Sequence, residues 1–186
     1  MGRVIVIEFM SLDGVMQDPD GRDGTAQGGW AFRYGPETVA GDKFQLGSVL
    51  DQGVMLFGRK TWQLFSRIWP GRDTPFAARL NAVPKLVASR TLTDTSAFAN
   101  SQVIDGDLVV AVKRESRDVI ITGSLSVVHT LMAGDLIDEY RLLIFPTVLS
   151  TGERLFPAGG PPTYLELLSA EQTGAAVLTR FARAAR

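Results

Sequence analysis

The chain of 186 residues contains no cysteine and a single histidine, His129. The lack of cysteine excludes disulfide bonds, thiolate metal sites and a cysteine nucleophile. One histidine is too few for a multi-histidine zinc site, and a Ser-His-Asp triad is not expected either. We therefore predict no metal site, and metal-dependent hydrolysis is not among the functions that this sequence favours.

An excess of charge of one sign is also lacking. The chain has 19 Lys and Arg residues against 20 Asp and Glu residues, which gives a formal net charge of -1. Nucleic acid is not an expected partner, because no broad positive field is available to attract its phosphates. The apolar run at the amino terminus ends at Asp13, is too short to span a membrane and has no signal-cleavage pattern. We predict a cytoplasmic protein without a membrane partner.

The composition, with 45% hydrophobic and 21% charged residues, is that of a soluble globular protein. A chain of this length buries roughly 70% of the surface that its unfolded form exposes. We predict a single domain over residues 1–186. The pattern G-x-x-x-x-G-K-[ST] does not occur, which disfavours a P-loop phosphotransferase.

Apolar periodicity predicts alternating strands and helices, followed by strands alone. Strands are expected at residues 3–9, 54–57, 85–88, 102–104 and 119–122, and helices at 37–51, 62–68, 75–83, 107–114 and between Ser124 and Gly134. Residues 139–145, 164–169 and 175–182 read as strands without helices between them. This order indicates an α/β fold with a mixed, mostly parallel sheet flanked by helices and an antiparallel C-terminal extension.

The segment from Gln17 to Pro36 has neither helical nor strand periodicity and is rich in Gly, Asp and aromatic residues. Long loops in compact domains are usually functional or disordered. The aromatic residues Trp30, Phe32 and Tyr34 favour an ordered flap that closes over a flat heterocyclic substrate, on which they would stack. Burial of the three rings beneath the flap is the alternative.

Glycine, hydroxyl and cationic residues follow three of the predicted parallel strands. Ligands of open α/β sheets bind beyond the carboxyl ends of the strands, so these positions form a candidate anion site. They are Gly58, Arg59, Lys60 and Thr61 after one strand, Ser89, Arg90 and Thr91 after another, and Gly123, Ser124 and Leu125 after a third. Taken singly, each is a helix cap or a solvated turn as readily as a phosphate site. One dinucleotide with several phosphates would explain all three.

The same segments resemble one protein family. The chain resembles the dihydrofolate-reductase-like family, which includes the reductase domain of the bacterial riboflavin-biosynthesis deaminase-reductase. Four segments occur in the order seen in that family: residues 55–62, 84–92, 122–124 and 136–142. Residues 11–14, Ser-Leu-Asp-Gly, and 152–156, Gly-Glu-Arg-Leu-Phe, follow the same pattern. The resemblance therefore spans nearly the whole chain and implies a dihydrofolate-reductase-like fold.

The resemblance implies an NADPH-dependent reductase of a small heterocycle, such as 5-amino-6-(5-phosphoribosylamino)uracil or a pterin. It implies that Arg59, Thr61, Ser89 and Arg90 hold the adenine-ribose end of NADPH and that Gly123 and Ser124 meet the pyrophosphate. Dihydrofolate reductases have a second glycine where this chain has Ser124. A homodimer through the C-terminal strands is also implied. The alternative is a non-catalytic NADP(H)-binding or interaction protein that retains the fold.

Two carboxylates are candidates for the catalytic group. An ungapped register from Gly58 places Asp42 where dihydrofolate reductases have a carboxylate on a helix, and Asp13 follows the first strand. A helix-surface carboxylate and a turn-forming aspartate are the respective alternatives. His129 lies in the middle of a predicted helix and is assigned no role.

Overall fold

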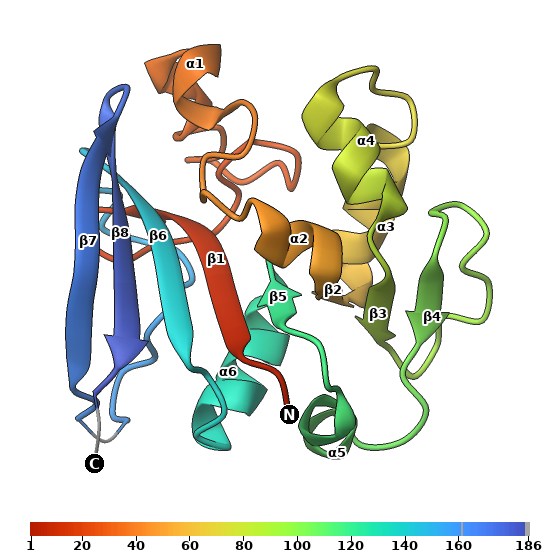
Figure 1. Ribbon diagram of the computed structural model, residues 1–186. Helices are drawn as coiled ribbons and strands as arrows, with labels where there is room; N and C mark the ends of the chain where they lie inside the picture. The colour runs from red at the N-terminus through yellow and green to blue at the C-terminus, as the bar shows by residue number, and fades with distance from the viewer. Residues whose placement is uncertain (161, 185–186) are drawn as a thin grey trace. The chain divides into compact units, whose positions relative to one another are not determined.

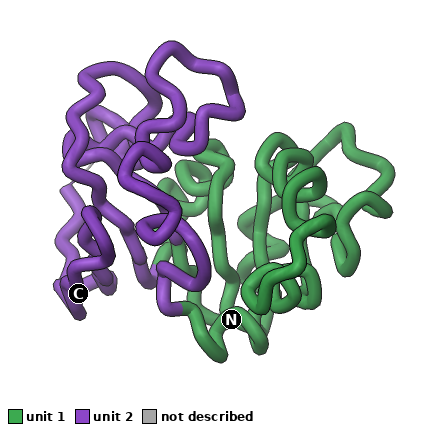
Figure 2. Tube along the Cα trace, turned by 90° about the horizontal axis from the view of Figure 1, so that it is seen from above, with its two compact units in different colours: residues 1–6, 46–137 green, residues 7–45, 138–186 purple. Residues whose placement is uncertain are grey.

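The structure, a computed structural model, describes residues 1–160 and 162–184. The chain divides into two compact units, which Figure 2 shows in different colours. The first unit comprises residues 1–6 and 46–137, and the second comprises residues 7–45 and 138–186. Strand β1 (Val4–Ser11) contributes residues to both units. A single domain over the whole chain stays a prediction.

The first unit is built on parallel strands in the order β4-β3-β2-β5-β1 (Figure 1). Their bounds are β2 Val54–Gly58, β3 Lys85–Ala88, β4 Ser101–Val103 and β5 Val119–Ile121. Each neighbouring pair in this set is parallel. Every residue of β2 and β5 is buried, which explains why these strands read as continuous apolar runs in the sequence.

Helices connect the parallel strands of the first unit. They are α2 (Ser48–Gln52), α3 (Arg59–Ile68), α4 (Pro75–Ala82), α5 (Leu108–Arg114) and α6 (Leu125–Ala133). Side chains cap two of them at their N-termini: Thr74 accepts from the Ala77 amide, and Asp107 accepts from the Val110 amide. Helix α3 contacts β2 and β3, and α6 contacts β2.

The second unit contains the antiparallel C-terminal extension that the sequence predicts. Its strands β6 (Glu139–Phe145), β7 (Leu165–Thr173) and β8 (Ala176–Arg183) lie in the order β6-β8-β7, and both pairings are antiparallel. A bulge interrupts β7 between Leu167 and Ser169. Together with the parallel strands this gives a mixed, mostly parallel sheet of eight strands with helices, as predicted.

Aromatic packing organises the core of the second unit. The Phe145 ring on β6 makes edge contacts with the rings of Trp30 and Phe9, with centroids 5.5 and 5.6 Å apart. Leu143, Leu178, Ala31 and Ala176 belong to the same buried cluster, and the partly buried Phe9 packs against it. The short 3-10 helix η1 (Phe32–Tyr34) begins two residues after Trp30, with Ala31 at its N-cap. Part of the loop predicted at residues 17–36 is therefore fixed by core packing.

The helix predicted over residues 37–51 is wrong. The structure has the short helix α1 (Pro36–Val39) and then α2, with no helix between them. Gly41, Gln45 and Gly47 adopt φ values of 77°, 51° and 49°, a left-handed region that ends an α-helix. Asp42 consequently lies in a bend and not on a helix.

The guanidinium of Arg141, on β6, holds this irregular segment. It donates to the carbonyl oxygens of Phe44 and Gln45 at 3.0 and 2.5 Å. A continuous helix would use such carbonyl groups internally. In the part of the chain that the structure describes, no helix is both long enough and apolar enough to span a membrane.

Candidate functional site

The carboxyl ends of β2 and β5 lie side by side in the first unit. The two strands pair in parallel, with Leu56 opposite Ile121. Helix α3 begins directly after Gly58, and α6 begins directly after Ser124. The hydroxyl oxygens of Thr61 and Ser124 are 3.1 Å apart. Two helix N-termini therefore meet at one edge of the sheet.

Glycine permits this close approach. A Cβ at Gly58 would lie 2.1 Å from Ser124 Oγ, and a Cβ at Gly123 would lie 2.9 Å from Thr61 Oγ1. Gly123 also has a φ of 55°, which L side chains rarely adopt. The peptide bond between Gly123 and Ser124 is cis. Neither glycine can gain a side chain without displacing a neighbour.

Neither helix N-terminus is capped by a side chain among the described residues. Ser124 occupies the N-cap position of α6, but its hydroxyl makes no capping hydrogen bond. Gly58, at the N-cap of α3, has no side chain to offer. The first-turn N–H groups of both helices thus lack a side-chain acceptor, and such groups bind anion oxygens.

Two exposed cations lie at the N-terminus of α3. Arg59 and Lys60 form the first turn of α3, where positive side chains are unfavourable beside the helix dipole unless an anion is present. Within residues 1–160 and 162–184, neither side chain has an ion-pair partner. Their charge is therefore available to a ligand.

The turn after β3 lies at the same edge. Ala88 on β3 is opposite Gly58 on β2. The Ser89 hydroxyl accepts from the amides of Thr91 and Leu92 at 3.2 and 3.0 Å, so this side chain shapes the turn. Arg90 and Thr91 are exposed.

All the residues predicted to bind cofactor therefore lie at the strand ends of one unit. They are Gly58, Arg59, Lys60, Thr61, Ser89, Arg90, Thr91, Gly123, Ser124 and Leu125. Their role in binding stays a prediction.

The carboxylate of Asp13, in the second unit, accepts hydrogen bonds through both of its oxygens. It accepts hydrogen bonds from the Ser11 hydroxyl at 2.7 Å and from the amides of Leu149 and Ser150 at 3.1 and 2.8 Å. The Ser11 hydroxyl and these amides lower the pKa of Asp13 to about 2. The carboxyl is thus ionised at neutral pH and has no proton to give. Its contacts favour an anchoring role over proton donation.

Asp42, the other candidate, is half-buried in the bend between α1 and α2. Its carbonyl oxygen accepts from the Gln45 amide at 3.1 Å. The Arg141 guanidinium fixes the same segment through the Phe44 and Gln45 carbonyls. Asp42 is therefore held by the fold of the second unit, and its catalytic role stays a prediction.

The three aromatic candidates differ in exposure. Trp30 is 2% exposed and donates its indole N–H to the Gln17 carbonyl. Tyr34 packs against Phe145, and its hydroxyl lies 3.0 Å from the Pro146 carbonyl. Phe32 is 49% exposed. Trp30 is thus buried and Tyr34 half-buried, while Phe32 has a face open to a ligand. Substrate binding by the three rings stays a prediction.

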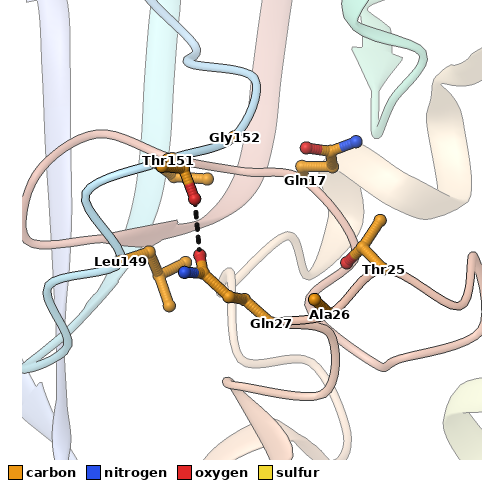
Figure 3. Close-up of a pocket in the computed structure, with 8 residues that line it drawn as sticks. Gln17, Thr25, Ala26, Gln27, Leu149, Thr151 and Gly152 are labelled. Atoms are coloured by element: carbon orange, nitrogen blue, oxygen red, sulfur yellow. Dashed lines mark hydrogen bonds between the residues drawn. The ribbon is translucent and has the colours of Figure 1, made fainter.

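The second unit also contains a pocket of about 150 Å³ that was not predicted from the sequence (Figure 3). It is lined by Val15, Gln17, Thr25, Ala26, Gln27, Leu149, Thr151 and Gly152. No lining side chain carries a formal charge. The Thr151 hydroxyl lies 3.1 Å from Gln27 Oε1, across the pocket (Figure 3). Isolated amides in a loop form no sequence pattern, so local reasoning had no signal for this pocket.

Lys85, the first residue of β3, was also missed. It is 1% exposed, and its ammonium group donates to the carbonyl oxygens of Asn81, Val83 and Ala99 at 3.0, 2.7 and 3.1 Å. The ammonium also lies 4.2 Å from the centre of the Phe98 ring. Burial lowers the pKa of Lys85 to about 8. The only sequence feature that could have indicated this buried ammonium group was a lysine at the start of an otherwise apolar strand.

Comparisons with known sequences relate the chain to one family. A family model described as the RibD C-terminal domain matches residues 3–179. The uncharacterized protein YyaP of Bacillus subtilis (strain 168) is 28% identical over 110 residues, which cover 55% of this chain. The match spans 58% of the length of that relative.

Solved structures share the fold. A protein from Shewanella sp. PV-4, provisionally named a riboflavin biosynthesis protein, has a TM-score of 0.73 and 21% identity, over 98% of this chain and 99% of its own. A pyrimidine reductase-like protein from Corynebacterium diphtheriae has a TM-score of 0.68 and 13% identity. The alignment covers 100% of this chain and 93% of that protein. RibD of Acinetobacter baumannii has a TM-score of 0.65 and 17% identity, over 99% of this chain and 58% of RibD.

Proposed function

Because the chain belongs to the RibD C-terminal domain family, we propose that it is an NADPH-dependent reductase of a small heterocyclic substrate. One observation carries the cofactor part of this proposal. The uncapped N-termini of α3 and α6 lie together at the ends of parallel strands, next to exposed Arg59 and Lys60. This arrangement has the chemistry of a phosphate site.

The residues present fit a dinucleotide phosphate ester. The first-turn amides of α6, beginning at Leu125, would donate to the pyrophosphate, and the glycines at 58 and 123 allow the Thr61 and Ser124 side chains, and with them the two helix N-termini, to lie close together. Arg59 and Arg90 would bind the 2′-phosphate that distinguishes NADPH from NADH. Thr61, Lys60, Ser89 and Thr91 border the same edge of the sheet.

NADPH, when bound, supplies the hydride for reduction of a C=N or C=O bond. The reduced atom pair also needs a proton. We assign its delivery to Asp42 and not to Asp13, because three hydrogen-bond donors hold the carboxylate of Asp13 in an anchoring contact with the turn at residues 149–150. Phe32 would stack on the flat ring of the substrate, since its side chain is exposed.

For the substrate we propose a pyrimidine of the riboflavin-biosynthesis type, 5-amino-6-(5-phosphoribosylamino)uracil or a close analogue, with a pterin as the second choice. The names of the similar structures, a pyrimidine reductase-like protein and RibD, support this proposal. We further propose a cytoplasmic homodimer without nucleic-acid or membrane partners.

The experiment that tests the function has two steps. NADPH binding is first measured by fluorescence titration, and NADPH oxidation is then followed at 340 nm with a panel of pyrimidines, pterins and simple ketones. Saturable binding with oxidation by one heterocycle is the expected result. Binding without oxidation by any of them would instead support a non-catalytic NADP(H)-binding protein. Absence of binding would contradict both.

A further inference from the structure

Two segments of the second unit are joined along their length. Residues 12–17 follow β1 in the chain, and residues 147–155 follow β6. The Leu12 amide donates to the Thr147 carbonyl at 2.8 Å, the Met16 amide to the Glu153 carbonyl at 3.0 Å, and the Leu155 amide to the Gly14 carbonyl at 3.1 Å. Val15 and Arg154 form an isolated antiparallel bridge. Neither segment can move far without the other.

The carboxylate of Asp13 lies at the centre of this connection. Its two oxygens accept from consecutive amides, Oδ1 from Leu149 and Oδ2 from Ser150. The Arg154 guanidinium, 3.6 Å away, balances its charge. The side chain of Asp13 is 18% exposed, so water competes little for these hydrogen bonds. One side chain thus orders a turn that is 136 residues away along the chain.

The same two segments form walls of the uncharged pocket (Figure 3). Val15 and Gln17 come from the first segment, and Leu149, Thr151 and Gly152 come from the second. Gly152 has a φ of 119°, and a Cβ there would lie 2.7 Å from Val15 Cγ1. The turn is therefore fitted closely against the first segment, and the position of that turn sets the width of the pocket.

The third wall, at residues 25–27, is organised separately. Asp18 is 3% exposed and accepts from the Asp23 amide and from both the amide and the hydroxyl of Thr25, all at 2.8 or 2.9 Å. Asp18 orders its own loop only. Asp13 is the carboxylate that joins two walls distant in the sequence.

We propose that Asp13 is a positioning residue that fixes the turn at residues 149–152 against residues 15–17, and that the pocket thus formed receives an uncharged polar part of the substrate. Gln17 Oε1 accepts from the Glu153 amide at 3.2 Å, and Gln27 Oε1 lies 3.1 Å from the Thr151 hydroxyl, so the two carboxamides would offer their N–H groups to a ligand. Such donors suit the carbonyl oxygen of an amide or lactam edge, and no lining charge would pair with a phosphate or carboxylate. The substrate part of this inference rests on the proposed function.

Hydrogen exchange tests the positioning role without any activity measurement. In Asp13→Asn, the exchange rates of the Leu149 and Ser150 amides, measured by NMR, rise at least tenfold relative to the wild type. Asp20→Asn is the matched control, because Asp20 is also paired with an arginine, Arg22 at 3.1 Å, but does not contact the turn. Unchanged exchange at both amides in Asp13→Asn would overturn the positioning role.

Steady-state kinetics separate positioning from proton donation. With the substrate found in the panel, Asp13→Asn raises KM several-fold and leaves the pH dependence of kcat in place. A hundredfold loss of kcat at unchanged KM, with loss of one limb of the pH profile, would make Asp13 catalytic and overturn the proposal. If no heterocycle is reduced, the proposed function fails, and the exchange measurement still decides the role of Asp13.

A second variant tests the pocket itself. Ala26→Met adds bulk at the pocket wall and leaves Asp13 and the groups that donate to it, the Ser11 hydroxyl and the Leu149 and Ser150 amides, chemically unchanged. Its KM for substrate rises at least fivefold, while exchange at Leu149 and Ser150 stays at the wild-type rate. An unchanged KM would show that substrate does not enter the pocket.

Discussion

The hydroxyl of Thr61, in the first turn of α3, lies 3.1 Å from the hydroxyl of Ser124 at the N-cap of α6. The Ser124 hydroxyl contacts the neighbouring helix instead of capping its own. Both helices therefore keep first-turn amides for an external acceptor. A phosphate ester bound at this place is expected to contact both helices at once.

Arg59→Ala and Arg90→Ala should each weaken NADPH binding by about ten- to a hundredfold, because a charge-assisted hydrogen bond contributes roughly 1.5 to 3 kcal/mol. NADH binding should barely change, since NADH lacks the 2′-phosphate. Fluorescence titration with both dinucleotides in moderate salt measures the difference. Arg67→Ala, in the last turn of α3, is the matched control. Equal losses for both dinucleotides would indicate a general structural effect.

Substitution of Trp30 should lower stability, whereas substitution of Phe32 should weaken substrate binding without a large loss of stability. Trp30→Ala removes a buried indole and should lower the free energy of unfolding by about 3–5 kcal/mol, measured by urea denaturation. Phe32→Ala should change it by less than about 0.5 kcal/mol, because the ring is 49% exposed. The KM for substrate should rise in Phe32→Ala. An unaltered KM would remove Phe32 from the site.

Lys85 should make stability depend on pH in alkaline solution. Its pKa is about 8 in the folded chain against 10.5 for an ordinary lysine, so between these values the unfolded chain binds more protons. The free energy of unfolding should rise through this window, by up to about 3 kcal/mol. Urea denaturation at pH 7.5 and pH 10 measures it, with Lys85→Met as the reference. Equal slopes in both proteins would contradict the prediction.

The exposed apolar residues of β7 and β8, and Tyr164 just before β7, should be covered in a homodimer. Tyr164, Leu167, Leu168 and Val177 are 80%, 57%, 47% and 40% exposed. Burying such side chains against a second copy is favourable. Sedimentation at micromolar concentration should give twice the mass of one chain, and Leu167→Glu should shift the population toward monomer. A wild-type monomer at that concentration would exclude the dimer.

Local sequence patterns predicted most of the fold. The strands at Lys85–Ala88 and Glu139–Phe145 have the predicted bounds, because each is rich in residues that favour strands and has residues typical of turns beside it. The helix expected at residues 37–51 fails for a tertiary reason. Arg141, almost one hundred residues further on, takes the carbonyls that a helix would have used. Apolar spacing there reflects packing against the core and not helical periodicity.

For the candidate site too, local features could be predicted from the sequence and long-range contacts could not. The residues that follow strands, such as Gly58 and Gly123, were found because strand ends can be located from sequence alone. The role of Asp13 was not found, because Leu149 and Ser150 lie 136 and 137 residues away from it. Burial of Trp30 likewise depends on Phe145, which no local window contains.

The fit between Gly58 and Ser124 also restricts how this sequence can change over generations. With a serine at 124, a methyl group at 58 would lie 2.1 Å from the hydroxyl oxygen. It would also lie 2.6 Å from the Cβ of Ser124. Alanine at 58 therefore becomes tolerable only after 124 has become glycine, and the reverse order passes through a destabilised intermediate. Homologues that carry both replacements should have acquired the glycine at 124 before the alanine at 58. The two positions should therefore vary together in related sequences, and the change at 124 should lie on the older branch of their tree.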